Sequence, residues 1–160
     1  MLNVKVTFCA PVYITEDSEK VSAAVSNMVN FGRPKSEENR AEFEKPGIGD
    51  ENIKQTARIN GNLELLSGIH YLIRKEEIID TVNTALKDGI DDSGCKTRVA
   101  LNKQAALMKH LSFPADDEPL GSVYLTIEAE TQDALLKIID WLTPPTKEGV
   151  PVYELKMKEL

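Results

Sequence analysis

Two segments far apart in the chain place an apolar residue at every second position. In residues 2–13 these are Val4, Val6 and Phe8, and residues 121–129 repeat the pattern. A period of two is that of a β-strand, whose side chains point alternately to the two faces of a sheet. A sheet that is apolar on one face has to be covered on that face, so the rest of the chain must supply amphipathic helices.

Three segments have apolar residues at helical spacing. The first begins after Thr15-Glu16-Asp17, where acidic side chains suit the positive end of the helix dipole. Residues 63–89 hold two apolar stripes separated by a charged Arg-Lys-Glu-Glu run, which favours two helices, with Gly89 as a C-terminal cap. The last helix begins at Thr131, and Pro144-Pro145 ends it.

Further strands are predicted between these helices, at residues 53–60, 97–101 and 106–113. The polar region 30–52 is either a long loop or a hairpin with a short strand at 41–45. The tail, 144–160, is expected to add a short strand or to remain loosely attached. This order predicts a single α+β domain over residues 1–160. Its curved sheet is largely antiparallel, with a mixed sheet as the alternative, and its helices lie on one face.

Charge is distributed unevenly along the chain. The net charge of −7 and the pI near 4.9 argue against a general nucleic-acid binder, because phosphate contacts require basic side chains. The five predicted strands nevertheless hold five basic residues against Glu128 alone, a balance of +4 that leaves −11 elsewhere. A strand at 41–45 would lower +4 to +3. The basic residues of these strands are Lys5, Lys54, Arg58, Arg98 and Lys109.

All of these except Lys109 are predicted to share the outward face of the sheet with Tyr124. Basic side chains with an aromatic ring suit RNA, whose phosphates attract cations and whose unpaired bases stack on rings. The alternative is that they are ordinary solvated strand residues, which also discourage association between sheet edges.

Residues 97–113 contain no carboxylate at all. Within them, Asn102-Lys103-Gln104 joins two predicted strands and offers amide groups and one fixed charge, which suit base edges and phosphates. The alternative is a purely structural connection, in which the Asn caps its own backbone and the Lys is solvated.

The residue types of metal and covalent chemistry are scarce and scattered. Cys9, Cys95, His70 and His110 lie far apart in sequence, without the close spacing of a zinc site. We therefore expect no metal, no cofactor and no enzymatic activity. Unpaired cysteines are typical of a reducing cytoplasm, and no apolar run is long enough to cross a membrane.

Four stretches together resemble a known family: LNKQAA at 101–106, PLGSVYLTIEA at 119–129, IIDWLTPPT at 138–146 and YITEDSEKVSAAVSNM at 13–28. The family is archaeal and consists of uncharacterised proteins predicted to bind RNA. The resemblance implies a fold similar to the 5S-rRNA-binding ribosomal protein of the large subunit. The family motif has an aromatic residue after its two alanines and a glycine two residues further on, where this chain has Leu107 and Lys109.

The sequence thus predicts a cytoplasmic RNA-binding protein without enzymatic activity, whose partner is structured RNA. The predicted contact residues are Arg98, Asn102, Lys103, Gln104 and Lys109, with Lys5, Lys54 and Arg58 as supporting phosphate contacts. The alternative is a protein-interaction or scaffold module that engages partners through its acidic helices, without nucleic acid. A homodimer or another protein partner is left open, and no membrane is expected.

Overall fold

The computed structural model describes residues 3–31, 39–46, 51–114 and 118–160. The strands of its main sheet are β1 (Val4–Tyr13), β2 (Glu42–Glu44), β3 (Ile53–Gly61), β4 (Lys96–Leu101) and β5 (Val123–Ala129). The helices are α1 (Ser18–Asn30), α2 (Ser67–Lys75), α3 (Ile79–Asp88), α4 (Lys103–Leu107) and α5 (Gln132–Leu142). Single turns of 3₁₀ helix are η2 (Leu63–Leu66) and η3 (Met157–Glu159), and a small hairpin consists of β6 (Thr146–Lys147) and β7 (Val150–Pro151).

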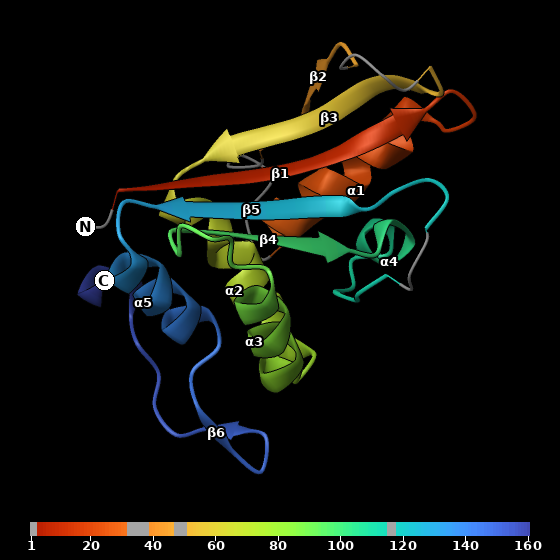
Figure 1. Ribbon diagram of the computed structural model, residues 1–160. Helices are drawn as coiled ribbons and strands as arrows, with labels where there is room; N and C mark the ends of the chain where they lie inside the picture. Colours follow the sequence, from red (N-terminus) through yellow and green to blue (C-terminus); the bar gives the residue numbers. More distant parts are fainter. Residues whose placement is uncertain (1–2, 32–38, 47–50, 115–117) are drawn as a thin grey trace.

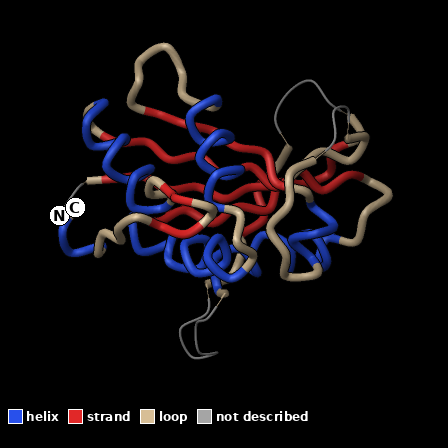
Figure 2. Tube along the Cα trace, turned by 90° about the horizontal axis from the view of Figure 1, so that it is seen from below, coloured by secondary structure: helices blue, strands red, loops and turns tan. Residues whose placement is uncertain are grey.

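The five strands form one sheet in the order β2-β3-β1-β5-β4, and every neighbouring pair is antiparallel. Helices α1, α2, α3 and α5 lie against one face of this sheet, and the other face carries no element of the described chain (Figures 1 and 2). The predicted α+β class, with helices on one face, is therefore confirmed. The sheet is antiparallel throughout rather than mixed.

One-sided burial of β1, the central strand, explains the two layers. Val4, Val6, Phe8, Ala10 and Val12 point toward the helices and are at most 4% exposed. The side chains between them are partly or fully exposed. Because alternate residues of a strand face opposite ways, the period-two pattern sorts them into a core side and a solvent side.

The strand predicted at 106–113 is wrong, because α4 ends at Leu107 and residues 108–114 have no regular structure. Asn102 Oδ1 accepts a hydrogen bond from the Ala105 backbone N–H at 2.8 Å, which caps α4 at its N-terminus. Gln and Ala are good helix formers, so capping and propensity outweigh the short apolar alternation here. Lys109 is thus not a strand residue.

The balance of charge in the strands is also smaller than predicted. Lys96 opens β4, whereas Glu42 and Glu44 belong to β2. The five strands of the sheet hold five basic and three acidic residues, a balance of +2 instead of +4 or +3.

The two regions left open by the sequence both contain strands. Within residues 30–52, β2 pairs with β3, as the hairpin alternative predicts; residues 32–38 and 47–50 lie outside the described part of the chain. In the tail, β6 and β7 form a hairpin that projects from the body (Figure 1). The tail beyond it returns to α2, where Arg74 pairs with Glu154 at 2.6 Å.

The predicted division of residues 63–89 into separate helices is confirmed, since α2 ends at Lys75 and α3 begins at Ile79. Gly89 is the C-terminal cap of α3, as expected. Its φ of −84° is open to any residue, so conformational freedom is not what requires glycine. A Cβ at this position would lie 2.2 Å from the backbone oxygen of Arg98, so only glycine lets α3 pass this close to β4.

We expect Gly89→Ala to lower the free energy of unfolding by about 2 kcal/mol, because the added methyl group must push α3 away from the β4 backbone. Chemical denaturation measures the change. Gly61→Ala is the control, because a Cβ there meets only the flexible side chain of Leu65 at 3.2 Å or more. Equal losses for the two variants would contradict the explanation.

Candidate nucleic-acid interface

The face of the sheet away from the helices, here called the open face, carries the strand charges. Its strands contribute Lys5, Thr7, Cys9, Pro11, Thr56, Arg58, Asn60, Lys96, Arg98, Ala100, Tyr124, Thr126, Glu128, Glu42 and Glu44. Four of these residues are basic and three are acidic, a balance of +1 on a protein whose net charge is −7. The open face is therefore a region of positive excess on an acidic molecule.

Arg98 and Tyr124 interact on β4 and β5. The guanidinium carbon of Arg98 lies 4.1 Å from the centroid of the Tyr124 ring, a cation–π contact. Arg98 itself is exposed. The ring expected to stack on bases is thus covered on one side by a cation, and the accessible group at this point is the guanidinium.

Three charges lie in register at the end of the open face where β1 begins. Lys5 on β1 and Lys96 on β4 are both directly opposite Glu128 on β5. All three side chains are exposed. Opposite charges across neighbouring strands attract weakly in water, so this row keeps one net positive charge.

Arg58 lies toward the β2 edge of the sheet, and its guanidinium group forms an ion pair. Its Nε donates to Glu44 Oε2 at 2.9 Å, and both side chains are about a third or more exposed (32% and 51%). A pair this exposed contributes little to stability, so the guanidinium can be drawn to another anion.

Cys9 lies between Arg58 and Tyr124 at the centre of the open face. Burial raises the pKa of its thiol, although Arg58 and Arg98 act in the opposite direction. The thiol is therefore protonated at neutral pH and is a poor nucleophile.

Lys103 does not lie on the open face, and its ammonium group is already occupied. It donates to the backbone oxygens of Pro11 at 2.8 Å and Leu120 at 2.5 Å, and to Glu16 Oε1 at 3.0 Å. Its side chain is only 12% exposed. Desolvation lowers the pKa of Lys103, opposed by its hydrogen bond to Glu16. Lys103 therefore ties α4 to the end of β1, to the start of α1 and to the segment before β5.

Some of the neighbouring residues in the LNKQAA stretch have structural roles, and others are exposed to solvent. Asn102 caps α4, and Ala106 is fully buried while its carbonyl oxygen accepts from Asn27 Nδ2 at 3.1 Å. Gln104 and Lys109 are exposed. Gln104 lines a cleft of about 310 Å³ between α4 and the start of α1, together with Lys20.

Lys109 has a φ of +63°, in the left-handed region that favours glycine. Glycine adopts this conformation without a steric penalty, so the glycine that the family resemblance implies at this position would suit the backbone. Lys109 therefore places a charge beyond the end of α4 in a strained backbone.

Lys54 lies near the start of β3, and its ammonium group already donates a hydrogen bond. The pairing of β1 with β3 shifts register between Val12 and Tyr13, and Lys54 Nζ donates to the backbone oxygen of Glu16 at 2.9 Å. The eight predicted contact residues thus fall into groups. Lys5, Arg58 and Arg98 share the open face, whereas Asn102, Lys103, Gln104 and Lys109 gather around α4.

Sequence reasoning missed Lys96 and the neutral polar residues Thr7, Asn60 and Thr126. Lys96 lies one residue before the predicted strand and in phase with Arg98, so extending the alternation would have found it. The hydroxyl and amide groups carried no signal, because polar residues are expected at any outward strand position.

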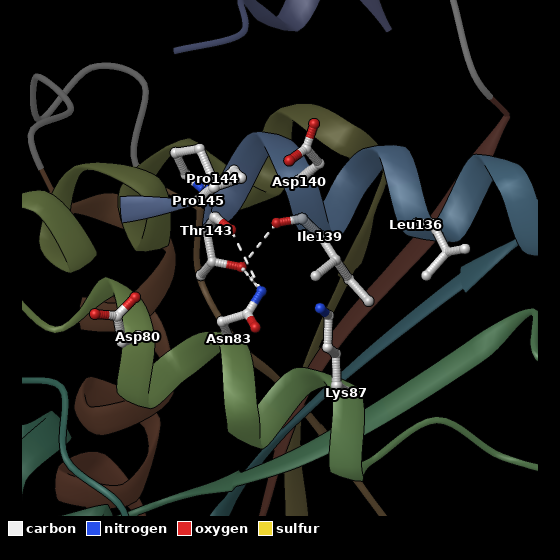
Figure 3. A pocket seen from close by; sticks show the side chains of 9 residues that line it. All are labelled: Asp80, Asn83, Lys87, Leu136, Ile139, Asp140, Thr143, Pro144 and Pro145. Atoms are coloured by element: carbon white, nitrogen blue, oxygen red, sulfur yellow. Dashed lines mark hydrogen bonds between the residues drawn. The ribbon is translucent and has the colours of Figure 1, made fainter. Parts of the chain in front are cut away.

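A second cleft, of about 330 Å³, lies between α3 and α5 (Figure 3). Most of its polar groups bind one another or the tail. Asn83 Nδ2 donates to Thr143 Oγ1 at 2.9 Å, and Asp80 accepts from Thr146 Oγ1 at 2.8 Å. These hydrogen bonds therefore attach the β6–β7 hairpin and the segment before it to α3.

The scattered histidines have structural partners. His70 stacks on Trp141 with ring centroids 4.7 Å apart, and His110 Nδ1 lies 2.9 Å from Glu76 Oε1. In the parts of the chain that the structure describes, His, Cys, Asp and Glu side chains nowhere gather in a group of three or more that could hold a metal ion. Within the same parts, no helix has the length and apolarity to cross a membrane.

Together, the fold and the open face define a class: a two-layer α+β protein with one uncovered sheet face of positive excess. A family model described as "RNA binding" matches residues 5–130. The UPF0201 protein of Methanosarcina acetivorans is 40% identical, over 98% of this chain and 93% of that protein. The UPF0201 protein of Aeropyrum pernix is 37% identical, over 98% and 95%. This chain belongs to that RNA-binding family, alongside the archaeal UPF0201 proteins.

Solved structures agree with this assignment. The crystal structure of a UPF0201 protein from Methanococcus jannaschii superposes with a TM-score of 0.69 and 27% identity, and covers 93% of this chain and 99% of that one. A DUF54 protein from Methanothermobacter thermautotrophicus has the same fold, with a TM-score of 0.57 and 22% identity over 89% and 99%.

We expect Lys103→Met to lower the free energy of unfolding by about 3 kcal/mol, because it leaves the largely buried Glu16 carboxylate without its cation. Denaturant unfolding measures the loss, and Gln104→Ala, one residue further along α4, should change stability by less than about 0.5 kcal/mol. A double-mutant cycle with Glu16→Gln isolates the coupling between Lys103 and Glu16. A coupling energy near zero would contradict the assigned role.

Lys109→Gly should raise the free energy of unfolding by about 1 kcal/mol, because glycine adopts positive φ without the steric penalty of a Cβ. Thermal unfolding measures the gain. Lys109→Ala removes the same charge but keeps the Cβ, so it should show no such gain. A gain of equal size in both variants would point to the charge instead of the backbone.

Proposed function

We propose that this protein binds RNA through the open face of its sheet. The observation that carries the proposal is the placement of charge: Lys5, Lys96 and Arg98 point away from the helices on an uncovered face. The acidic excess lies elsewhere, in helices and loops. Because the acidic body repels a polyanion, the open face is the most favourable approach for RNA among the described parts of the chain.

Membership of a family described as RNA binding supports the proposal. The geometry supports a narrower set of contacts than the sequence predicted. Arg98 and Lys5 are the principal phosphate contacts, Lys96 joins them, and Arg58 contributes when it exchanges Glu44 for a phosphate. Gln104 and Lys109 remain predicted contacts at the border of the site. Asn102 and Lys103 support it by holding α4 in place.

The likeness to the 5S-rRNA-binding ribosomal protein fold stays a prediction. It agrees with the two-layer architecture, but the assignment of the open face does not depend on it. The absence of enzymatic activity, a cytoplasmic location and a homodimer or protein partner also stay predictions.

Replacing Arg98, Lys5 and Lys96 together by Ala should weaken RNA binding and raise the Kd at least about tenfold at low salt, because three phosphate contacts are lost. The slope of log K against log salt should also become shallower, by about one for each lost contact. Fluorescence anisotropy with a labelled structured RNA measures both quantities.

Lys147→Ala is the matched control, because Lys147 is an exposed lysine on the hairpin that projects away from the sheet. Its Kd and salt slope should match those of the unchanged protein. Glu128→Gln should act in the opposite sense and tighten binding, because it removes the carboxylate between Lys5 and Lys96. If the triple variant binds as tightly as the unchanged protein, the open face is not the site.

The alternative proposal, a protein-interaction module that uses the acidic helices, predicts a different result. Its partner would remain bound after nuclease treatment and would be insensitive to the triple replacement on the open face. No contact in the described parts of the chain favours this alternative over RNA binding.

A further inference from the structure

The middle of the open face carries a row of neutral hydrogen-bonding groups that the phosphate contacts do not explain. Register places Asn60 on β3 beside Thr7 on β1, Thr7 beside Thr126 on β5, and Thr126 beside Arg98 on β4. We call Asn60, Thr7 and Thr126 the polar row. With neighbouring strands about 4.8 Å apart, the row and Arg98 together span roughly 15 Å across the sheet.

The hydrogen bonding within the polar row leaves groups for a ligand. The Thr7 hydroxyl donates to Asn60 Oδ1 at 3.0 Å, so its lone pairs face outward as acceptors. The amide nitrogen of Asn60 and the hydroxyl of Thr126 have no side-chain hydrogen bond to any described residue. The row therefore presents donors and acceptors side by side, without charge.

Cations lie on two sides of the polar row. Lys5 on β1 and Lys96 on β4 lie two residues from the row, on either side of Glu128, and Arg98 closes the row at β4. A ligand that fits this pattern needs negative groups outside and neutral hydroxyl or amide groups between them. RNA offers both, because each ribose 2′-hydroxyl is a donor and an acceptor that lies between phosphates.

The form of RNA follows from the shape of the face and from its aromatic groups. Proteins that bind unpaired RNA bases stack them on accessible rings. Here one side of the Tyr124 ring is covered by the Arg98 guanidinium at 4.1 Å, and Lys103 Nζ lies 5.5 Å from the centroid of the Tyr13 ring. A duplex requires no stacking surface, since its wide, shallow minor groove displays 2′-hydroxyls to a broad protein surface.

We propose that the open face recognises double-stranded RNA along its minor groove, with the polar row contacting 2′-hydroxyl groups and the flanking cations contacting phosphates. This inference rests on the proposed function and narrows its ligand. It makes the protein selective for ribose over deoxyribose and for duplex over single strand, with little dependence on base sequence.

The test compares three probes with the unchanged protein: an RNA duplex of about 16 base pairs, the DNA duplex of the same sequence, and one RNA strand alone. We expect the RNA duplex to bind at least about tenfold more tightly than the other two, because only it offers paired 2′-hydroxyls in a shallow groove. Tighter binding of the single strand, or equal binding of both duplexes, overturns the inference.

The second measurement uses Thr7→Val combined with Thr126→Val, which removes both hydroxyls but keeps side-chain shape and strand propensity. The preference for the RNA duplex over the DNA duplex should fall about tenfold, because the 2′-hydroxyls lose their partners. The salt slope should not change, since no phosphate contact is lost. Thr56→Val, on the same face but outside the polar row, is the matched control and should keep the full preference.

The outcomes separate this inference from the proposed function. If no probe binds at low salt, the function itself fails. If RNA binds and the triple replacement of Arg98, Lys5 and Lys96 weakens it, but the threonine variants keep full preference for the RNA duplex, the function stands and the role of the polar row is refuted.

Discussion

One-sided burial of β1 is the constraint on which the rest of this structure depends. The strand is central, so β3 and β5 both take their register from it, and its five helix-facing side chains are at most 4% exposed. A shift of one residue would bring Lys5 into the core and expose Phe8. The same register therefore places the core under the helices and brings Lys5, Thr7 and Cys9 to the open face.

Lys103 shows how a conspicuous residue can be structural. Its sequence context, in a segment without carboxylates, suggests an available cation. In the fold, its ammonium group binds two backbone oxygens and Glu16 and fixes the position of α4. Much of the LNKQAA stretch is explained in this way, by a cap, an internal ion pair and a buried alanine. The part of that stretch that remains available to a ligand is Gln104.

The open face has a weak positive excess, and this sets the kind of binding it can support. Glu128 lies opposite Lys5 and Lys96, and Glu44 forms an ion pair with Arg58, so the face attracts a polyanion only weakly. On a protein of net charge −7, affinity then depends on how well individual groups match the ligand. If the open face binds RNA as proposed, its geometry and hydrogen bonding should discriminate among nucleic acids more than its charge does, in keeping with the polar row at its centre.

The sequence by itself determined the order and type of most elements, the one-sided sheet and the family. Period-two and helical spacing made the elements predictable, because they report directly on which side chains must be buried. The prediction of a strand at 106–113 was wrong, because the N-terminal cap that Asn102 forms on α4 outweighed a short alternation of apolar residues. Only the tertiary structure decided which charges remain free. Lys103 became internal and the Tyr124 ring received the Arg98 guanidinium, because their partners come from segments distant in sequence or from neighbouring strands. Likewise, Asn60, Thr7 and Thr126 form one row only when strand register aligns them.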